Sequence, residues 1–224
     1  TSITDIIEMP NGDIWFSTWG GGIRMLDSAL RPKSYDIYQP APPAEIGPLQ
    51  QSNAKLTWSM CLDQTGENLW IGCQGGLLMI HNLASRQTRY VLVPEADQGT
   101  IRYIAKDKRG VMWLGTQNGR LIKYEQGIFR SIYNVGTIIY KVFVDKQGWL
   151  WIATHEKGIY AFDPVYGNML QHYTSDGAAN RLYSNTGTDI EQLNDSTIVY
   201  AAGVLNLINK RTHRLRWLGY EDGL

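Results

Sequence analysis

Short stretches of alternating apolar and polar residues run along the whole chain, and most of them end in a turn that contains Gly. The segment GVMWLGTQNGRLIKYEQG, residues 110–127, is an example. As a strand, its MWLGT part would place Trp113 and Gly115 on one face and Leu114 and Thr116 on the other. Apolar, β-branched stretches such as residues 139–144, IYKVFV, precede segments of this kind. The pattern predicts short β-strands joined by tight turns.

The same pattern occurs five times in the chain, and four of the five copies have an indole at the same place. Trp15, Trp70, Trp113 and Trp151 mark this place, and Val199 stands there in the fifth copy. The spacings of 55, 43, 38 and 48 residues lie in the range of propeller blades rather than of helical solenoids. We therefore expect repeat units at about residues 1–53, 54–98, 99–135, 136–185 and 186–224.

Each repeat unit is expected to form four short strands. The first turn runs from Asp to Gly in residues 63–66, 107–110 and 145–148, as the hydrogen bonds and positive φ of a tight turn require. Two residues after the Trp position the side chain is small in every unit, at Ser17, Gly72, Gly115, Ala153 and Ala201. A bulky indole beside a small residue suits sheets stacked face to face. The predicted fold class is all-β, a β-propeller of four-stranded antiparallel blades.

The turn carboxylates of Asp63, Asp107 and Asp145 are expected to cap the backbone of their turns. Glycosidase chemistry needs two carboxylates that face each other across a bound sugar, and the sequence singles out no such pair. The four histidines, His81, His155, His172 and His213, fall at different places in their units. No catalytic residue, metal site or cofactor is therefore predicted.

Composition and charge narrow the classes of partner. The 21 basic and 21 acidic residues cancel, so the chain has no electrostatic footprint for nucleic acid. No apolar run approaches the ~18 residues of a bilayer span, so no membrane segment is expected in this chain. Cys61 and Cys73 fit no metal-ligand spacing and are expected to be buried free thiols, with a disulfide as the alternative.

The motif D-x-x-G-x-x-W-I-G-T-x-x-G-G-L, followed by a short fourth strand and by DGL, resembles the two-component regulator propeller repeat. The resemblance extends over essentially all of the chain. It is strong in the second, third and fourth units. It is fair in the first, where Met9 replaces the turn Asp, and weak in the fifth, which lacks both the Trp and the turn Gly.

This resemblance implies the sensor region of a bacterial hybrid two-component histidine kinase, which lies outside the cytoplasmic membrane and is therefore periplasmic. It also implies recognition of a ligand, often an oligosaccharide, and transmission of the signal by a homodimer of the parent protein. Propellers of this family usually have more than five blades, and YEDGL at the end of the chain is similar to the lead-in of a further unit. We expect the five units to be part of a larger propeller, with a closed five-bladed ring as the alternative.

Sugar-binding surfaces combine aromatic faces with amide and charged hydrogen-bonding groups. We expect such residues at one rim of the propeller, in turns between second and third strands, in the links between blades, or at the mouth of the channel. The candidate ligand-binding residues are Trp19, Trp58, Gln74, Arg102, Gln117, Asn118, Tyr140, His155, Arg181 and Tyr183. The long links at residues 39–55 and 174–188 rank above the short ones because they depart from the repeat.

Two other functions stay open. Some lyases that act on cyclic peptide antibiotics are propellers with a similar Gly-x-x-Trp repeat, and they use a rim histidine with an acidic partner. His155 and Glu156 are the local hint of such an enzyme, although adjacent turn residues tend to point apart. A protein-interaction scaffold would instead present an apolar outer patch, for which Trp217, Leu218 and Tyr220 are the candidates.

Overall fold

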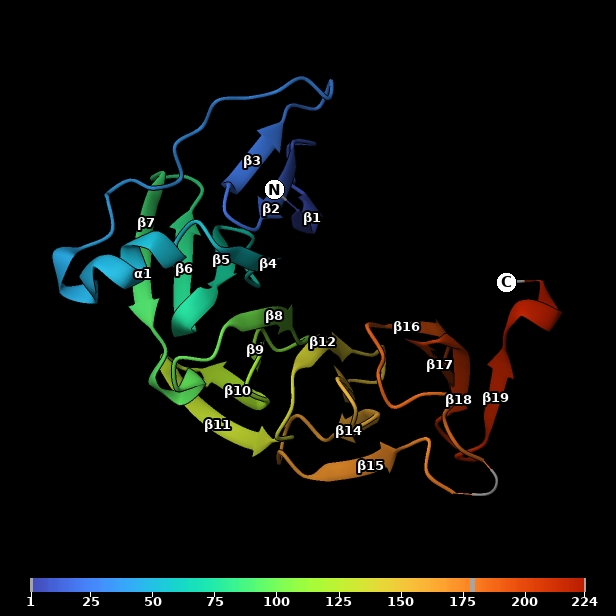
Figure 1. Ribbon diagram of the computed structural model, residues 1–224. Helices are drawn as coiled ribbons and strands as arrows, with labels where there is room; N and C mark the ends of the chain where they lie inside the picture. The colour runs from blue at the N-terminus through green and yellow to red at the C-terminus, as the bar shows by residue number, and fades with distance from the viewer. Residues whose placement is uncertain (1, 178–179, 224) are drawn as a thin grey trace. The chain divides into compact units, whose positions relative to one another are not determined.

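The computed structural model describes residues 2–177 and 180–223, so residues 178 and 179 of the second long link lie outside the described part. Its regular structure is almost entirely β-strand, arranged in five antiparallel sheets of consecutive strands (Figure 1). The first sheet contains β1 (Ile3–Glu8), β2 (Ile14–Thr18) and β3 (Gly22–Leu26). The second contains β4 (Thr57–Leu62), β5 (Asn68–Cys73), β6 (Leu77–Asn82) and β7 (Gln87–Leu92).

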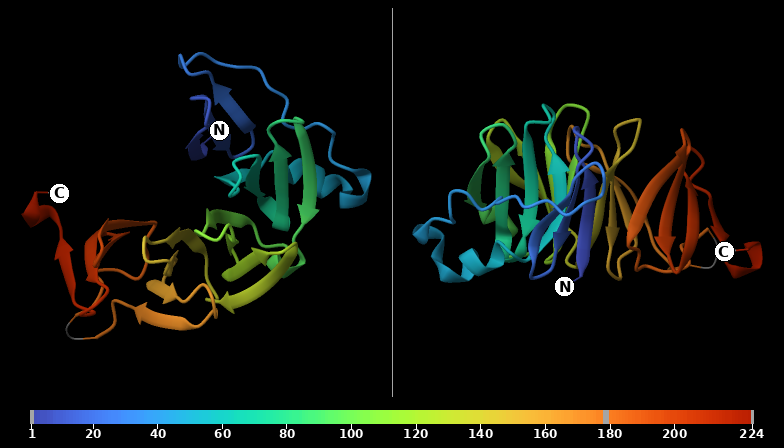
Figure 2. Two further views of the ribbon diagram at one scale, coloured as in Figure 1. Left: turned by 180° about the vertical axis from the view of Figure 1, so that it is seen from behind. Right: turned by 90° about the horizontal axis from the view of Figure 1, so that it is seen from above.

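The three later sheets have four strands each. The third contains β8 (Ile101–Lys106), β9 (Met112–Thr116), β10 (Arg120–Glu125) and β11 (Ile128–Asn134). The fourth contains β12 (Ile139–Val144), β13 (Leu150–Thr154), β14 (Ile159–Phe162) and β15 (Met169–Tyr173). The fifth contains β16 (Asp189–Asn194), β17 (Thr197–Ala202), β18 (Val204–Asn209) and β19 (Leu215–Leu218). Within each sheet neighbouring strands run side by side in sequence order, as both views in Figure 2 show. The predicted all-β propeller fold is confirmed, and we number these sheets blade 1 to blade 5.

Blade 1 departs from the prediction of four strands in every unit, because it has only three. The backbone N–H of Lys33 still donates to Met25 O at 3.0 Å. Beyond Lys33 the chain leaves β3, and the N–H of Ile23 bonds the Tyr38 hydroxyl instead, at 3.3 Å. The segment from Pro32 to Gln39 turns to blade 2, whose Thr88 N–H donates to Gln39 O at 2.6 Å. We call residues 32–39 the strap.

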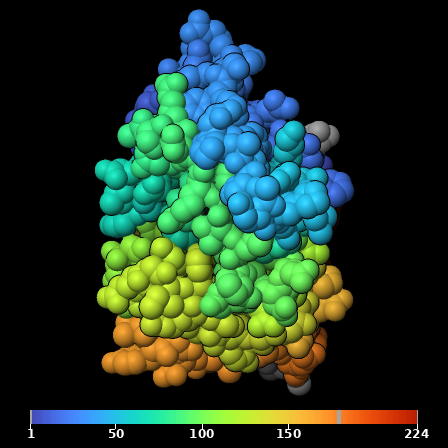
Figure 3. All heavy atoms as spheres, turned by 90° about the vertical axis from the view of Figure 1, so that its left-hand side faces the viewer, coloured from blue at the N-terminus to red at the C-terminus, as the bar shows by residue number. Residues whose placement is uncertain are grey.

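The link after the strap contains helical turns that the sequence pattern did not predict. Residues Ala44–Ile46 form a 3-10 turn, and α1 (Gly47–Asn53) follows with Pro48 in its first turn. Two more 3-10 turns, Gln74–Gly76 and Pro94–Ala96, lie in blade 2 and after it, and a last one spans Tyr220–Asp222. In Figure 3 the strap and link (blue) lie over the surface beside the outer strand β7 (green).

The described chain divides into two compact units. The N-terminal unit is Thr1–Thr116 with Ile122–Ser131, and the C-terminal unit is Gln117–Leu121 with Ile132–Leu224. Blades 1 and 2 and most of blade 3 belong to the N-terminal unit, whereas blades 4 and 5 belong to the C-terminal unit.

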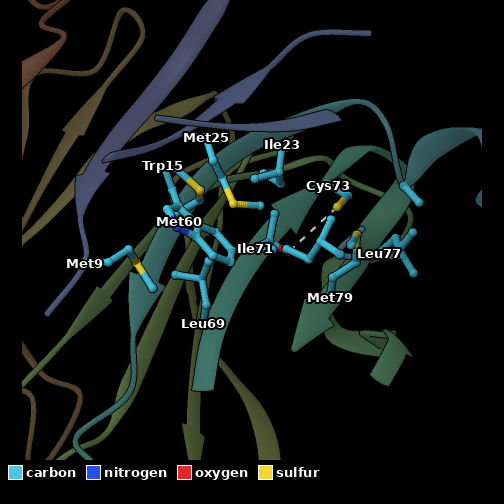
Figure 4. Packing of buried hydrophobic residues seen from close by; sticks show 12 residues of the cluster. Met9, Trp15, Ile23, Met25, Met60, Leu69, Ile71, Cys73, Leu77 and Met79 are labelled. Atoms are coloured by element: carbon cyan, nitrogen blue, oxygen red, sulfur yellow. Dashed lines mark hydrogen bonds between the residues drawn. The ribbon is translucent and has the colours of Figure 1, made fainter. Parts of the chain in front are cut away.

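The core of the N-terminal unit consists of two clusters of buried side chains. One contains Trp15, Ile23 and Met25 of blade 1 together with Met60 and Ile71 of blade 2 (Figure 4). The other joins Trp70, Leu78 and Ile80 of blade 2 to Ile104, Met112 and Leu114 of blade 3. Successive residues of β5 therefore serve opposite clusters, as strand alternation requires.

The small residue after each indole is explained by close approach of the next blade. A Cβ on Gly72 would lie 2.6 Å from the backbone oxygen of Ile101, the first residue of β8. In the C-terminal unit, Trp151 and Ala153 of blade 4 likewise pack with Ile190, Ile198 and Tyr200 of blade 5. Each fully buried large apolar side chain contributes about 1.5–3 kcal/mol, so these faces hold neighbouring blades together.

The turn carboxylates cap their turns as predicted. In blade 4 the N–H of Gly148 donates to Asp145 O at 2.9 Å, and Asp145 Oδ1 accepts the N–H groups of Gln147 and Trp149. Asp107 and Asp63 accept backbone N–H groups in the same way. These hydrogen bonds explain why an Asp opens each of the three turns.

Candidate functional site

The first strand of blades 1 to 4 contains a β-bulge near its start. Two residues of the first strand oppose one residue of the second, which leaves Thr4, Trp58, Arg102 and Tyr140 as the extra residues. A bulge redirects a side chain out of the regular strand pattern and is common next to binding sites. Three of the four bulge residues are candidates from the sequence. The fourth, Thr4, is used in packing, because its hydroxyl bonds Thr57 O at 2.9 Å and Ser17 Oγ at 2.7 Å.

In the N-terminal unit the bulge residues Trp58 and Arg102 stack on each other. The guanidinium carbon of Arg102 lies 3.8 Å from the centre of the Trp58 ring, which is close cation–π contact. The indole N–H of Trp58 is buried and has no hydrogen-bond partner within the described residues. Burying an unpaired donor costs about 1–3 kcal/mol, so this position is held against its local preference by the blades around it.

Trp19 and Gln74 lie at the same end of blades 1 and 2, and both contact Leu56, the residue that follows the link. Trp19 forms an antiparallel bridge with Leu56, and the N–H of Gln74 donates to Leu56 O at 3.1 Å. Leu56 is two residues before Trp58. The Trp19 side chain is exposed, at 53%. We call Trp19, Trp58, Gln74 and Arg102 the rim cluster.

The structure adds two amide side chains to this end that the sequence pattern did not single out. A Cβ on Gly75, beside Gln74, would lie 2.5 Å from the Asn53 amide nitrogen and 2.9 Å from the Gln50 amide oxygen. Both amides belong to α1, and they bond each other at 2.9 Å. The only sequence signal was that link 39–55 departs from the repeat.

In the C-terminal unit Tyr140 and His155 meet edge to face, with ring centres 5.9 Å apart. The Tyr140 hydroxyl lies 3.4 Å from His155 Nδ1, and His155 Nε2 lies 3.2 Å from Glu156 Oε1. The expectation that His155 and Glu156 point apart is therefore wrong. Glu156 has φ of 66°, and this left-handed backbone lets its carboxylate reach the neighbouring ring. Both side chains are substantially exposed.

Arg181 and Tyr183 lie in the second long link, against blade 5. The indole N–H of Trp217 donates to Arg181 O at 2.8 Å, and its ring meets Tyr183 at 5.7 Å in a T-shaped contact. A cavity of about 930 Å³ lies beside Tyr183 and Trp217 and is lined also by Leu218 and Tyr220. The scaffold candidates and Tyr183 are thus brought together. Gln117 and Asn118 are exposed in the turn between β9 and β10, in the C-terminal unit.

The two cysteines, His172 and His213 lie in surroundings that suit a structural role. Both thiols are free, and burial raises the pKa of the Cys61 thiol to about 11, so it stays protonated at neutral pH. His172 bonds Lys157 O at 2.7 Å, and His213 Nδ1 lies 2.9 Å from the Tyr173 hydroxyl. Over residues 2–177 and 180–223, no group of three or more His, Cys, Asp or Glu side chains is placed to hold a metal.

Comparison with known proteins gives one family. Residues 96–118 match the sequence model of the family described as two component regulator propeller. No curated protein matches the chain. No helix in the described part of the chain is both long and apolar enough to cross a membrane.

Solved structures extend the likeness over most of the chain. The extracellular domain assigned to the hybrid two component system BT3049 of B. thetaiotaomicron is 25% identical, with a TM-score of 0.70 over 90% of this chain. This chain spans only 25% of that one. The extracellular domain assigned to the one component system BT4673 of the same organism is 17% identical, with a TM-score of 0.52 over 96% of this chain and 35% of its own. The WD40 β-propeller domain of Doa1, at 12% identity and a TM-score of 0.71 over 96% of this chain and 67% of its own, shares the fold.

Proposed function

Because the chain carries the two-component regulator propeller repeat and is similar to the extracellular domain of a hybrid two-component system, we propose that it is the ligand-sensing propeller segment of such a sensor. In this proposal the segment lies in the periplasm, is not itself catalytic, and belongs to a parent protein with a histidine kinase. The similarity to BT3049 over nine-tenths of the chain supports the sensor assignment.

The ligand class that we propose is an oligosaccharide, bound at the rim cluster. The observation that carries this is the stacking of Arg102 on Trp58, both on bulges, at the end of the blades where Trp19 is exposed. Sugars bind against aromatic faces while amide and charged groups take their hydroxyls. Gln74 and the α1 amides provide such groups at this end.

For a signal to pass, ligand binding must change the relative populations of two states of the sensor. A ligand shifts an equilibrium only as far as its affinities for the two states differ. We propose that two copies of the parent protein form a homodimer and that the bound oligosaccharide favours one arrangement of the pair. We propose the rim cluster as the place where that preference begins, because Trp19 is exposed there and Arg102 stacks on Trp58.

Isothermal titration calorimetry against pools of plant, host and microbial oligosaccharides tests the proposal. We expect one pool to bind, and Arg102→Ala or Trp19→Ala to weaken that binding at least about tenfold. Tyr166→Ala is the matched control, because Tyr166 is an aromatic residue that is 77% exposed and belongs to the turn between β14 and β15 of blade 4. Binding that is lost with Tyr166→Ala and kept with Arg102→Ala would contradict the site. Absence of binding to every pool would contradict the ligand class.

The contact of His155 with Glu156 and Tyr140 supports a second candidate, a lyase. In that case His155 would act as the general base, oriented by Glu156. Both groups are exposed, whereas such catalysis is favoured in a site that excludes water. His155→Ala separates the two: loss of turnover on a linear or cyclic substrate supports the lyase, and unchanged oligosaccharide binding supports the sensor.

A further inference from the structure

The first turn of blades 3 and 4 places a carboxylate against the indole of its own blade. In blade 4 the Trp151 indole N–H donates to Asp145 Oδ2 at 3.0 Å, and Lys210 Nζ bonds the same oxygen at 2.7 Å. In blade 3 Asp107 accepts the Trp113 indole N–H at 3.5 Å and a guanidinium nitrogen of Arg109 at 2.9 Å. A carboxylate, an indole donor and a cation thus form one recurring arrangement.

In blade 1 the indole is present and two cations, Lys33 of the strap and Arg86 of blade 2, line the same cavity, but the carboxylate is missing. Met9 stands six residues before Trp15, where Asp107 and Asp145 stand before their own indoles. The backbone turn is kept, because the N–H of Gly12 donates to Met9 O at 2.8 Å. Among the described residues the Trp15 indole N–H has no hydrogen-bond acceptor, and unlike that of Trp58 it is not cut off from solvent.

A cavity of about 330 Å³ lies at this turn. Its lining includes Met9, Asp13, Trp15, Lys33, Tyr35 and Arg86, all within the N-terminal unit. The cavity is at the end of β2 opposite the rim cluster, because Trp19 follows the last residue of β2 whereas Asp13 precedes the first. Ligand sites commonly measure about 300–1,000 Å³, so this one fits a molecule the size of a monosaccharide.

The charged residues that line this cavity are Asp13, Lys33 and Arg86, which together carry one excess positive charge. Lys33 Nζ lies 2.6 Å from Asp13 Oδ2, and this hydrogen bond holds the pKa of Asp13 below its ordinary value. Lys33 and Asp13 therefore balance each other as a charged pair. Arg86 is exposed, and its guanidinium carbon lies 5.3 Å from the centre of the Tyr35 ring. The excess cation suits one carboxylate on the ligand.

Tyr35 is fixed in place by a chain of hydrogen bonds through the buried His81. The Thr88 hydroxyl donates to Ile37 O, so it must accept from His81 Nδ1, which lies 2.8 Å away. His81 Nε2 is then the acceptor for the Tyr35 hydroxyl at 2.9 Å. Because its hydroxyl is engaged, Tyr35 presents its ring to the cavity, and Trp15 packs beside it with ring centres 5.3 Å apart.

We propose that this blade 1 cavity binds a uronate, an acidic sugar free or at the end of a chain. The ligand carboxylate accepts the Trp15 indole N–H and pairs with Arg86, in the role that Asp107 and Asp145 have in their blades. The sugar ring lies beside Trp15 and Tyr35. This site is separate from the rim cluster and does not depend on the function proposed for it.

Nuclear magnetic resonance of the whole chain with ¹⁵N-labelled tryptophan tests this directly. The Trp15 indole signal is assigned as the one missing from Trp15→Phe. We expect D-glucuronate to shift this signal in a saturable way and uncharged D-glucose to leave it unmoved. Arg86→Gln, a change of an exposed side chain, should weaken the glucuronate response about tenfold. An unmoved indole signal, or an equal response to glucose, overturns the proposal.

Restoring the missing carboxylate gives an independent test. Met9→Asp should move the Trp15 indole signal without ligand and abolish the glucuronate response, because the internal carboxylate takes the ligand's place. Met9→Leu, the apolar control, should keep the response. A full glucuronate response in a folded Met9→Asp protein contradicts the proposal. If Met9→Asp does not fold, the Arg86→Gln result decides.

Discussion

The first turns of blade 4 and blade 1 have the same backbone hydrogen bond, but only in blade 4 does the indole that follows bond a carboxylate of the turn. In blade 4 the Asp145 carboxylate is fully buried. It accepts the indole N–H of Trp151 in the same blade and pairs with Lys210 of the neighbouring blade 5. In blade 1 the corresponding residue is Met9, and the indole N–H of Trp15 is left without a partner in the described structure. The same repeat therefore closes one turn and leaves the other open.

This difference shows that the backbone forms the turn, whereas the carboxylate links the turn to the indole and to the next blade. The turn itself is made by the backbone, since the N–H groups of Gly12 and Gly148 both return to the residue three positions earlier. The carboxylate adds a bond to the indole and, in blade 4, a bond to the next blade. Loss of the carboxylate thus keeps the fold and frees donor groups for a ligand.

The largest effect is expected at the closed turn. Asp145→Asn leaves the Lys210 ammonium buried without its counter-charge, since Lys210 is 6% exposed. Breaking a buried ion pair from one side costs about 3–5 kcal/mol, and we expect this loss in the free energy of unfolding measured with urea. The double variant Asp145→Asn with Lys210→Met should recover at least half of it. A loss as small as that of an exposed pair would contradict the role of Asp145.

The second comparison uses the two indoles. Trp151→Phe removes a hydrogen bond to a buried carboxylate, whereas Trp15→Phe removes none, and both changes delete the same atoms. The difference in the free energy of unfolding should be about 1.5–3 kcal/mol, the contribution of a hydrogen bond to a charged group. Equal costs would show that Trp151 Nε1 contributes nothing through Asp145.

A smaller effect is expected from the histidine that holds the strap. Burial lowers the pKa of His81 from its ordinary 6.5 to about 4. The unfolded chain therefore takes up this proton first, and stability should fall as the pH is lowered from about 6.5 to about 4. In melting curves over this range, the decline should be shallower for His81→Gln than for the unaltered chain. Parallel pH profiles for the two proteins would contradict a neutral buried His81.

The smallest effect on stability is expected in the rim cluster. Arg102→Ala removes a cation–π contact at a half-buried site, which is worth about 0.5–2 kcal/mol. The melting temperature should fall only slightly. A loss of the size expected for Asp145→Asn would assign Arg102 to the core rather than to a ligand site.

The repeat predicted most of the fold because its signals are local. An Asp and a Gly three residues apart specify a turn, and an indole two residues before a small side chain specifies a stacked face. The strap escaped prediction because its partners in blade 2, such as Thr88, are far away in the sequence. Lys210 escaped for the same reason, since it reaches Asp145 from another blade.

The candidate site was predicted less well than the fold. The sequence singled out Trp58 and Arg102 as an aromatic and a charged residue near the start of a first strand. Their contact depends on β-bulges, which the residue pattern does not predict. The Asn53 and Gln50 amides are positioned by α1, a helix of seven residues that begins with Gly47-Pro48 in a link predicted only to be long. The open turn of blade 1 was visible as Met9 in place of Asp, yet its cavity depends on the strap.

Some residues of this propeller hold its blades together, and we propose that others, where the repeat deviates, bind the ligand. Thermal melting with and without the oligosaccharide found by calorimetry tests it in one experiment on Asp145→Asn and Arg102→Ala. We expect Asp145→Asn to lower the melting temperature but to keep the ligand-induced rise. We expect Arg102→Ala to lower the melting temperature only slightly but to reduce the ligand-induced rise strongly. The reverse pattern, or loss of the rise in both variants, would contradict the claim.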